Sequence, residues 1–422
     1  MFFLSLGWSA YLIKVPLITD SFEIFHFASQ FANNNFDGLN GSYLQNYPFQ
    51  LGLIGFQEII FRIFHSDSAV LIVLIFINCI MITFYYHFLY KISDLLFKSK
   101  QIQLLFSLLF IICLQIFLLV FPIYGWIPMQ LFTAISLYYL LKCSKKFSWK
   151  SIIISVLCIS FAYLFKSNAL IFLIGICLYL LGKTMSTKAN LLRNLFVLLI
   201  FICVPLSVGE IPKLVYEARS QINIESGMSK LTWINMGLTN KISTLDAPKN
   251  NGILEGNQIK SNGYFSGLTG DFSEESMVDI TVTSKEESSR YLKTLLGENI
   301  SQLSKNPIKS AEFFAKKYIS QWGSASFSGI FNIILAERGN NLLYNIFMFY
   351  MSGFGLIIAV FTTYSFYNIR NEQDFSKQLI PLIILGGILY STISEAQAIA
   401  VFPYYILMLP YAAKGIIDYK KL

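Results

Sequence analysis

Long apolar runs separated by short polar connections dominate the pattern along this chain. A helix needs about 20 predominantly apolar residues to cross the hydrocarbon core of a bilayer. Runs that approach this length lie near residues 1–17, 69–90, 102–121, 128–143, 151–165, 168–183, 191–209, 341–367, 377–393 and 399–414. The pattern therefore predicts an all-α polytopic membrane protein with about ten transmembrane helices.

Two longer regions outside these runs interrupt this pattern. The first covers residues 18–68, and the second covers residues 210–340, which read as helical from 284 to 320. The second region has the size of a small domain. We therefore expect an N-terminal transmembrane module over 1–209, a soluble, α-containing domain over 210–340 and C-terminal transmembrane helices over 341–422.

The composition agrees with a membrane protein. The chain is 55% hydrophobic and only 13% charged, whereas soluble domains are about 25% charged. Its six cysteines fall in or at the edges of apolar runs, so neither a disulfide framework nor a thiolate metal site is indicated.

The positive charges lie in alternate connections between the apolar runs. Basic residues follow the second, fourth, sixth, eighth and tenth runs, whereas residues 122–127 and 394–398 carry none and the connection near 166 carries only Lys166. By the positive-inside rule the basic connections are cytoplasmic. This predicts a multi-pass protein of the plasma membrane with both termini inside and residues 18–68 and 210–340 outside. The net charge of +8 then reflects topology rather than nucleic-acid binding.

Residues 47–64 form a further apolar stretch, but its polar residues argue against a span. Gln50, Gln57, Glu58 and Arg62 are costly at the middle of a bilayer. A crossing here would also move every later basic connection outside. We therefore expect a helix at the outer interface or packed against the bundle.

Asp20 is the first acidic residue and lies where the first apolar run ends. The chain from Asp20 onward predicts a helix, with an apolar face of Ile24, Phe27, Ala28 and Phe31 and an opposing polar stripe of Glu23, His26, Gln30 and Asn33. Two interpretations stay open. Asp20 is a general base acting on a lipid-carried substrate, or it belongs to the solvated face, or the N-cap, of an interfacial helix.

Three further positions on the predicted outer side carry candidate chemistry. Tyr47 and Gln50 stand in an aromatic, amide-rich stretch that suits either a sugar site or anchoring at the membrane interface. Lys166 either pairs with a lipid phosphate or extends to the headgroups. Glu395 and Gln397 stand in the last outer turn, where the acid is either functional or simply exposed. No nucleotide-binding loop, His/Cys metal spacing or Ser/His/Asp arrangement occurs in the sequence.

Several short motifs together resemble the GT-C superfamily of polytopic glycosyltransferases, specifically bacterial relatives of protein O-mannosyltransferases and aminoarabinose transferases. The resemblance rests on Asp20, Tyr47-Pro48-Phe49-Gln50-Leu51-Gly52, Phe165-Lys166-Ser167-Asn168-Ala169-Leu170, Trp233-Ile234-Asn235-Met236-Gly237-Leu238, Gly263-Tyr264-Phe265, Gln321-Trp322 and Glu395-Ala396-Gln397 with Phe402-Pro403-Tyr404.

This resemblance implies transfer of a sugar from a polyprenyl-phosphate donor to a glycan, lipid or protein acceptor on the outer face. Asp20 matches the family's base by position, and Lys166 is a plausible cation for the lipid phosphate. The implied substrate-binding residues are Glu23, His26, Tyr47, Gln50, Lys166, Glu395 and Gln397. No second acid adjoins Asp20, so a divalent metal is not supported, and no nucleotide cofactor is needed.

Two other classes share lipid-linked substrates. A transporter or flippase predicts charged residues deep in several spans and repeated broken helices, whereas mid-span acids are nearly absent here. A surface-polysaccharide polymerase usually carries arginines in its outer loops, and arginine is scarce in the short outer connections of this chain.

Overall fold

A computed structural model of the 422-residue chain describes residues 1–13, 15–17, 19–186, 190–238, 285–305, 307–323, 341–370, 372, 374–394 and 398–421. Across these ranges the regular elements are helices, and no strand occurs. Each of the ten predicted runs contains a helix. These are α1 (Phe2–Leu12), α5 (Asp67–Phe97), α6 (Lys100–Ile112), α8 (Trp126–Lys145), α9 (Trp149–Phe165), α10 (Ala169–Ser186), α11 (Leu191–Ser220), α16 (Asn341–Ile369), α17 (Leu379–Ile393) and α18 (Ala398–Tyr419).

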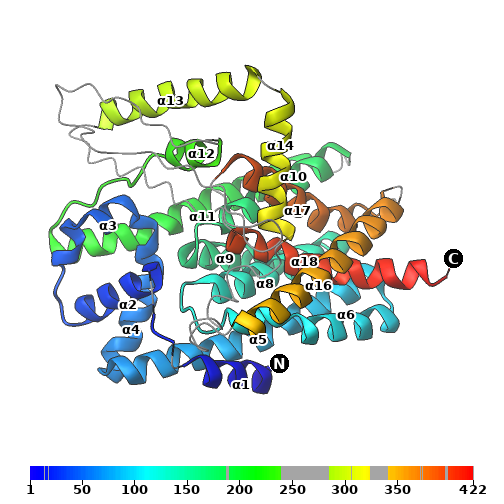
Figure 1. Ribbon diagram of the computed structural model, residues 1–422, viewed down its shortest axis with the longest axis horizontal. Coiled ribbons are helices and arrows are strands. Elements are labelled where there is room, and N and C mark those ends of the chain that lie inside the picture. The colour runs from blue at the N-terminus through cyan, green and yellow to red at the C-terminus, as the bar shows by residue number, and fades with distance from the viewer. Residues whose placement is uncertain are drawn as a thin grey trace.

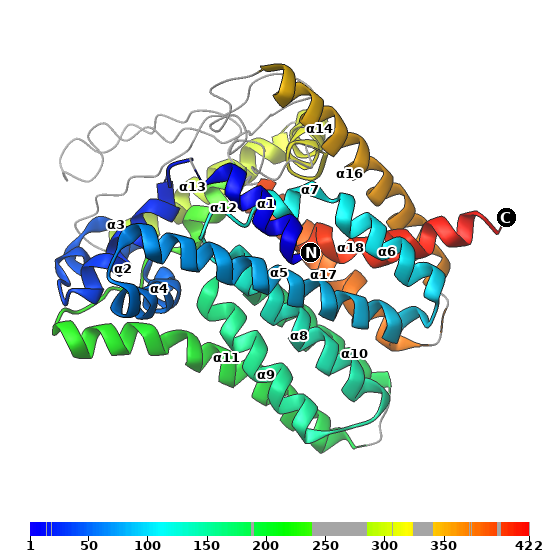
Figure 2. The ribbon, with the colours of Figure 1, turned by 90° about the horizontal axis from the view of Figure 1, so that it is seen from below.

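The chain is an all-α polytopic membrane protein, as the pattern predicts. Five segments in the described part of the chain are long and apolar enough to cross a membrane, namely Asp67–Phe97, Leu191–Ser220, Asn345–Ile369, Phe375–Ile393 and Ala398–Tyr419. Shorter apolar helices accompany them. In Figure 2, α5, α8, α9 and α11 lie side by side, and α18 passes between α16 and α6. Residues 400–413 of α18 are buried throughout, because this helix is apolar on every face.

Two groups of helices lie outside this bundle (Figure 1). The first contains α2 (Thr19–Ala32), α3 (Ser42–Asn46) and α4 (Leu51–Phe64), and the second contains α12 (Lys230–Leu238), α13 (Lys285–Lys305) and α14 (Pro307–Tyr318). Helix α4 packs against α2 and α5 and is not among the candidate spans. This agrees with the expectation that 47–64 packs against the bundle. The helices expected over 284–320 are confirmed as α13 and α14.

Three boundaries differ from the sequence predictions. Helix α1 ends at Leu12 rather than near 17, and α11 continues to Ser220, beyond the apolar run expected over 191–209. The run 102–121 divides into α6 and the short α7 (Leu114–Leu118), after which the chain is non-helical until α8. Side-chain amides replace helical hydrogen bonds there, since Asn78 donates to the Val120 carbonyl and Gln57 donates to the Ile123 carbonyl, each at 2.9 Å.

Several basic connections gather at one end of the bundle. The Lys145 ammonium donates to the Leu95 carbonyl, and the Lys183 ammonium donates to the Ser144 carbonyl at 3.3 Å. The Tyr179 ring also stacks on Phe375 at 5.2 Å. The positive-inside assignment requires such a common end, and the orientation in the membrane stays a prediction.

Candidate functional site

Asp20 lies in the first turn of α2, and two tyrosines hold its carboxylate. The apolar face of α2 is buried at Ile24, Ala28 and Phe31, which fixes the helix against its neighbours. The Tyr43 hydroxyl donates to Asp20 Oδ1 at 3.1 Å, and the Tyr124 hydroxyl donates to Asp20 Oδ2. Each carboxylate oxygen therefore accepts a hydrogen bond from a different tyrosine.

Tyr124 also connects Asp20 to two other predicted site residues. The buried Gln50 amide donates to the Tyr124 hydroxyl at 2.8 Å. The Lys166 ammonium lies 3.1 Å from the centroid of the Tyr124 ring and 4.9 Å from that of Trp126, and Lys166 is only 6% exposed. We call Asp20, Tyr43, Gln50, Tyr124 and Lys166 the Asp20 cluster.

Two glycines allow the segments of this cluster to approach one another. Gly52, in the first turn of α4, packs so closely on the Leu164 carbonyl that a Cβ atom would overlap it. Gly125 has φ +83°, and a Cβ atom there would lie 2.5 Å from the Phe165 carbonyl oxygen. A side chain at either position would push its segment away from the end of α9, which carries Lys166.

The electrostatics of the cluster keep both tyrosines as donors. Burial raises the pKa of Tyr43, and the charge of Asp20 raises it further. Burial and then the Asp20 charge likewise raise the pKa of Tyr124. A carboxylate offers about four lone-pair sites, so two hydrogen bonds orient Asp20 and leave acceptor capacity for a substrate proton.

Aromatic side chains continue from this cluster toward α12. The Tyr47 ring lies 5.1 Å from Tyr43, 6.0 Å from Phe49 and 6.0 Å from Trp233. The turn at Pro48 predicted from the sequence is a 3-10 helix, Pro48–Gln50, that leads directly into α4. Tyr47 therefore lies where the Asp20 cluster meets α12, which belongs to the second group of helices outside the bundle.

The remaining predicted site residues differ in their positions. Glu23 is half-buried on α2, and its charge acts on Tyr43. His26 is exposed, lies 3.0 Å from the Gln30 amide nitrogen and stacks on Phe22 at 5.8 Å, so its contacts run along the outer face of α2. Glu395 and Gln397 lie outside the described residues.

Lys317 joins the second group of helices outside the bundle to the end of α17. Lys317 is 4% exposed, and its ammonium donates to the carbonyls of Gly237 at 2.6 Å, Thr392 at 2.8 Å and Ser394 at 2.6 Å. Trp322 donates through its indole nitrogen to the Ser391 hydroxyl at 3.1 Å. Two of the motifs that carry the family resemblance, Trp233–Leu238 and Gln321-Trp322, therefore lie close to one buried lysine that sequence reasoning missed.

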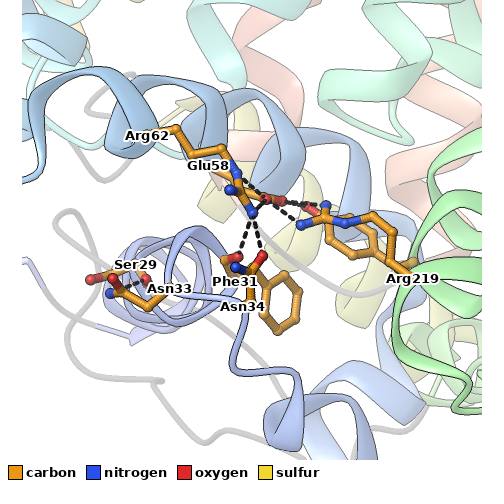
Figure 3. A network of polar contacts seen from close by, with 8 residues as sticks. Ser29, Phe31, Asn33, Asn34, Glu58, Arg62 and Arg219 are labelled. Carbon is orange, nitrogen blue, oxygen red and sulfur yellow. Dashed lines mark hydrogen bonds and ion pairs between the residues drawn. The ribbon is translucent and has the colours of Figure 1, made fainter.

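A second polar network anchors α2 and α4 (Figure 3). Glu58 accepts from both terminal nitrogens of Arg219, at 2.7 and 3.0 Å, and from the Tyr216 hydroxyl at 2.5 Å. The Arg62 Nε donates to Glu58 at 2.9 Å, and its Nη2 donates to the Phe31 carbonyl at 3.0 Å. We call Glu58, Arg62, Tyr216 and Arg219 the Glu58 network. These hydrogen bonds and ion pairs compensate for the cost of burying the Glu58 carboxylate.

Residues 54–208 match the family model of dolichyl-phosphate-mannose-protein mannosyltransferase. The match supports a membrane glycosyltransferase of GT-C type. It includes Tyr124 and Lys166 and ends before α12, and Asp20, Tyr43 and Gln50 precede it. No curated protein matches the chain.

Sequence reasoning missed both tyrosines that hold Asp20. Tyr43 stands in the aromatic stretch that was considered for sugar binding, four residues before Tyr47. Tyr124 stands in the connection 122–127, whose lack of basic residues indicated only its side of the membrane. Gly125 beside Tyr124 is the signal that was available, since an isolated glycine between bulky apolar residues often marks a close approach of backbone segments.

No metal site is evident in the part of the chain that the structure describes, where no group of three or more His, Cys, Asp or Glu side chains is arranged to hold an ion. The Asp20 carboxylate and the His26 imidazole each contact other partners. Asp20 binds tyrosines, and His26 contacts its own helix.

Proposed function

We propose that this protein transfers a sugar from a polyprenyl-phosphate donor to a hydroxyl group of a glycan, lipid or protein acceptor on the outer face of the membrane. The observation that carries the proposal is the Asp20 cluster, in which a carboxylate binds the hydroxyl of Tyr124 and a buried ammonium group lies over the ring of the same tyrosine. The family match and the polytopic helical fold support the same reaction class.

The reaction requires a base and a means of stabilising the leaving group. In our proposal the acceptor oxygen attacks the anomeric carbon while its proton passes to Asp20. The bond from that carbon to the donor's phosphate oxygen breaks, and the lipid phosphate leaves with the electron pair. Lys166 then stabilises the negative charge that develops on the phosphate.

The two tyrosines have a positioning role in this scheme. Tyr43 and Tyr124 fix the plane of the carboxylate, so the free lone pairs of Asp20 point in a defined direction. Tyr124 contacts both groups, since its hydroxyl donates to Asp20 and its ring lies beneath the Lys166 ammonium. Tyr47 and Trp233 supply aromatic faces at the joint with α12, and such faces suit the apolar side of a sugar ring.

The test is the Asp20→Asn variant in membranes supplied with radiolabelled polyprenyl-phosphate sugars. The amide cannot accept the acceptor's proton as a base, so transfer falls by about 100-fold or more. The matched control is Asp37→Asn, because Asp37 is an exposed acid in the same outer region. Unchanged transfer by Asp20→Asn at equal protein levels refutes the base assignment.

A further inference from the structure

A lysine-lined hollow lies between the end of α8 and the start of α9. It encloses about 480 Å³, and its lining includes Lys142, Lys146 and Lys150 together with Tyr139, Phe147 and Ser148. We call this the lysine hollow. Lys142 stands in the last turn of α8 and Lys146 is the extended residue that ends this helix, and both line the hollow.

The helix that follows adds to the positive potential. Helix α9 begins at Trp149, with the Ser148 hydroxyl accepting from the Ser151 amide at 3.4 Å. The amides at a helix N-terminus favour an anion, and a cation placed there is unfavourable. Lys150 stands in this first turn, so a bound anion would relieve a repulsion that the fold itself creates.

The lysines of this hollow are not neutralised within the described ranges of the chain. All three are exposed, and none of them forms an ion pair with a described carboxylate. Two acids at this end of the bundle pair with other lysines, since Glu372 binds Lys377 and Asp418 binds Lys414.

An exposed apolar strip adjoins the hollow. The Trp149 ring lies 5.2 Å from Phe147, which lines the hollow, and 6.1 Å from Phe196 on α11. Trp149 is 44% exposed, Phe196 is 53% exposed and Leu192 on the same helix is 83% exposed. A tryptophan between a charged site and apolar helix faces is typical of the membrane interface.

We propose that the lysine hollow binds the headgroup of an anionic phospholipid. The phosphate lies among the three ammonium groups, and the acyl chains follow Trp149, Leu192 and Phe196. A small soluble anion would use the lysines and leave this apolar strip without a role, which is why a lipid fits both features.

The experiment measures phosphatidylglycerol binding to the purified full chain in a neutral detergent by native mass spectrometry. The variant replaces Lys142, Lys146 and Lys150 with glutamine. Each lysine near an anionic headgroup contributes about a fivefold change in affinity, so the triple variant binds phosphatidylglycerol about 100-fold more weakly. Binding of zwitterionic phosphatidylcholine does not change.

The control variant replaces Lys100, Lys420 and Lys421, which are also exposed, with glutamine. It has the same net charge as the first variant and keeps the lysine hollow intact. An equal loss of phosphatidylglycerol in both variants overturns the proposal, because bulk charge then explains binding.

A second comparison separates a lipid from a soluble anion. We expect Trp149→Ala to weaken phosphatidylglycerol binding severalfold and to leave the weak binding of glycerol phosphate unchanged. Glycerol phosphate that binds as tightly as phosphatidylglycerol, and equally to both proteins, overturns the lipid assignment.

Discussion

Replacing Glu58 with glutamine probes how the fold holds the candidate site in place. Glu58 is 4% exposed and accepts hydrogen bonds from Arg219, Tyr216 and Arg62. The substitution keeps the shape of the side chain, but it removes the charge and points an amide donor toward guanidinium donors. Helices α2, α4 and α11 meet at this network, so its loss loosens the support of Asp20 and Gln50.

The expected cost follows from the burial of the partners. Breaking a fully buried ion pair by removing one partner costs about 3–5 kcal/mol. The side chains of Arg62 and Arg219 are 40% and 33% exposed, so water partly solvates the unpaired guanidinium groups. After this discount we expect Glu58→Gln to lower the free energy of unfolding by about 2 kcal/mol.

The assay is a double-mutant cycle with Arg219→Gln, read by thermal and denaturant unfolding in detergent. Because the two side chains share a bidentate contact, their effects should be non-additive by about 1–2 kcal/mol. Glu312→Gln is the matched control, since Glu312 forms an exposed ion pair with Lys316 on α14, and it should leave unfolding unchanged. Additive effects within error would show that the contact does not carry the stability assigned to it.

The stability difference between wild type and Glu58→Gln should also depend on pH. Burial alone would raise the pKa of Glu58, but hydrogen bonds from Arg219, Tyr216 and Arg62 outweigh it and hold the pKa below the ordinary 4.5. A carboxyl whose pKa is lowered by folding contributes stability above its unfolded pKa and loses it as the pH falls through the folded pKa. The stability gap between wild type and Glu58→Gln should therefore stay constant from neutral pH to about 4.5 and shrink below it.

Three further predictions concern the site and its supports. Tyr124→Phe keeps the ring under Lys166 but removes a hydrogen bond to a charged group, so sugar transfer should fall about tenfold, whereas Tyr367→Phe, at an exposed position, should not change it. Gly52→Ala should lower both stability and transfer because its Cβ atom meets a carbonyl of α9, whereas Gly353→Ala, which meets no atom within 4 Å, should stabilise by up to about 1 kcal/mol. Lys317→Met removes the donor of three backbone carbonyls, so hydrogen exchange should accelerate over α12 and α14, and unchanged exchange would contradict its docking role.

The helices were predictable because the bilayer sets their length and composition. An apolar run near 20 residues has few alternatives to a helix when no water can satisfy its backbone. The same reasoning excluded a span at 47–64 from its polar side chains. The break after Ile112 was not predictable, because the amides of Gln57 and Asn78 that satisfy the following backbone come from two other helices.

The candidate site was predictable only in part. Asp20, Gln50 and Lys166 were candidates from residue type and predicted side of the membrane, the family resemblance favoured them, and the structure brings them together around Tyr124. Tyr124 itself was missed because it stands 104 residues after Asp20. Local periodicity shows which face of a helix is buried and does not show which distant connection packs against it.

The two polar clusters share α2 and α4, and this sharing couples fold stability to the proposed chemistry. Asp20 stands at the start of α2, and Arg62 on α4 holds the end of the same helix through the Phe31 carbonyl. Gln50 immediately precedes α4, which carries Glu58. Lys166 follows α9, which packs on α4 and α11. We therefore expect a disturbance at Glu58 to change the distance between Asp20 and Lys166, the proposed base and cation, without touching either. Its kinetic signature should be a lower kcat with little change in KM, because displacement of these groups weakens interactions that form in the transition state.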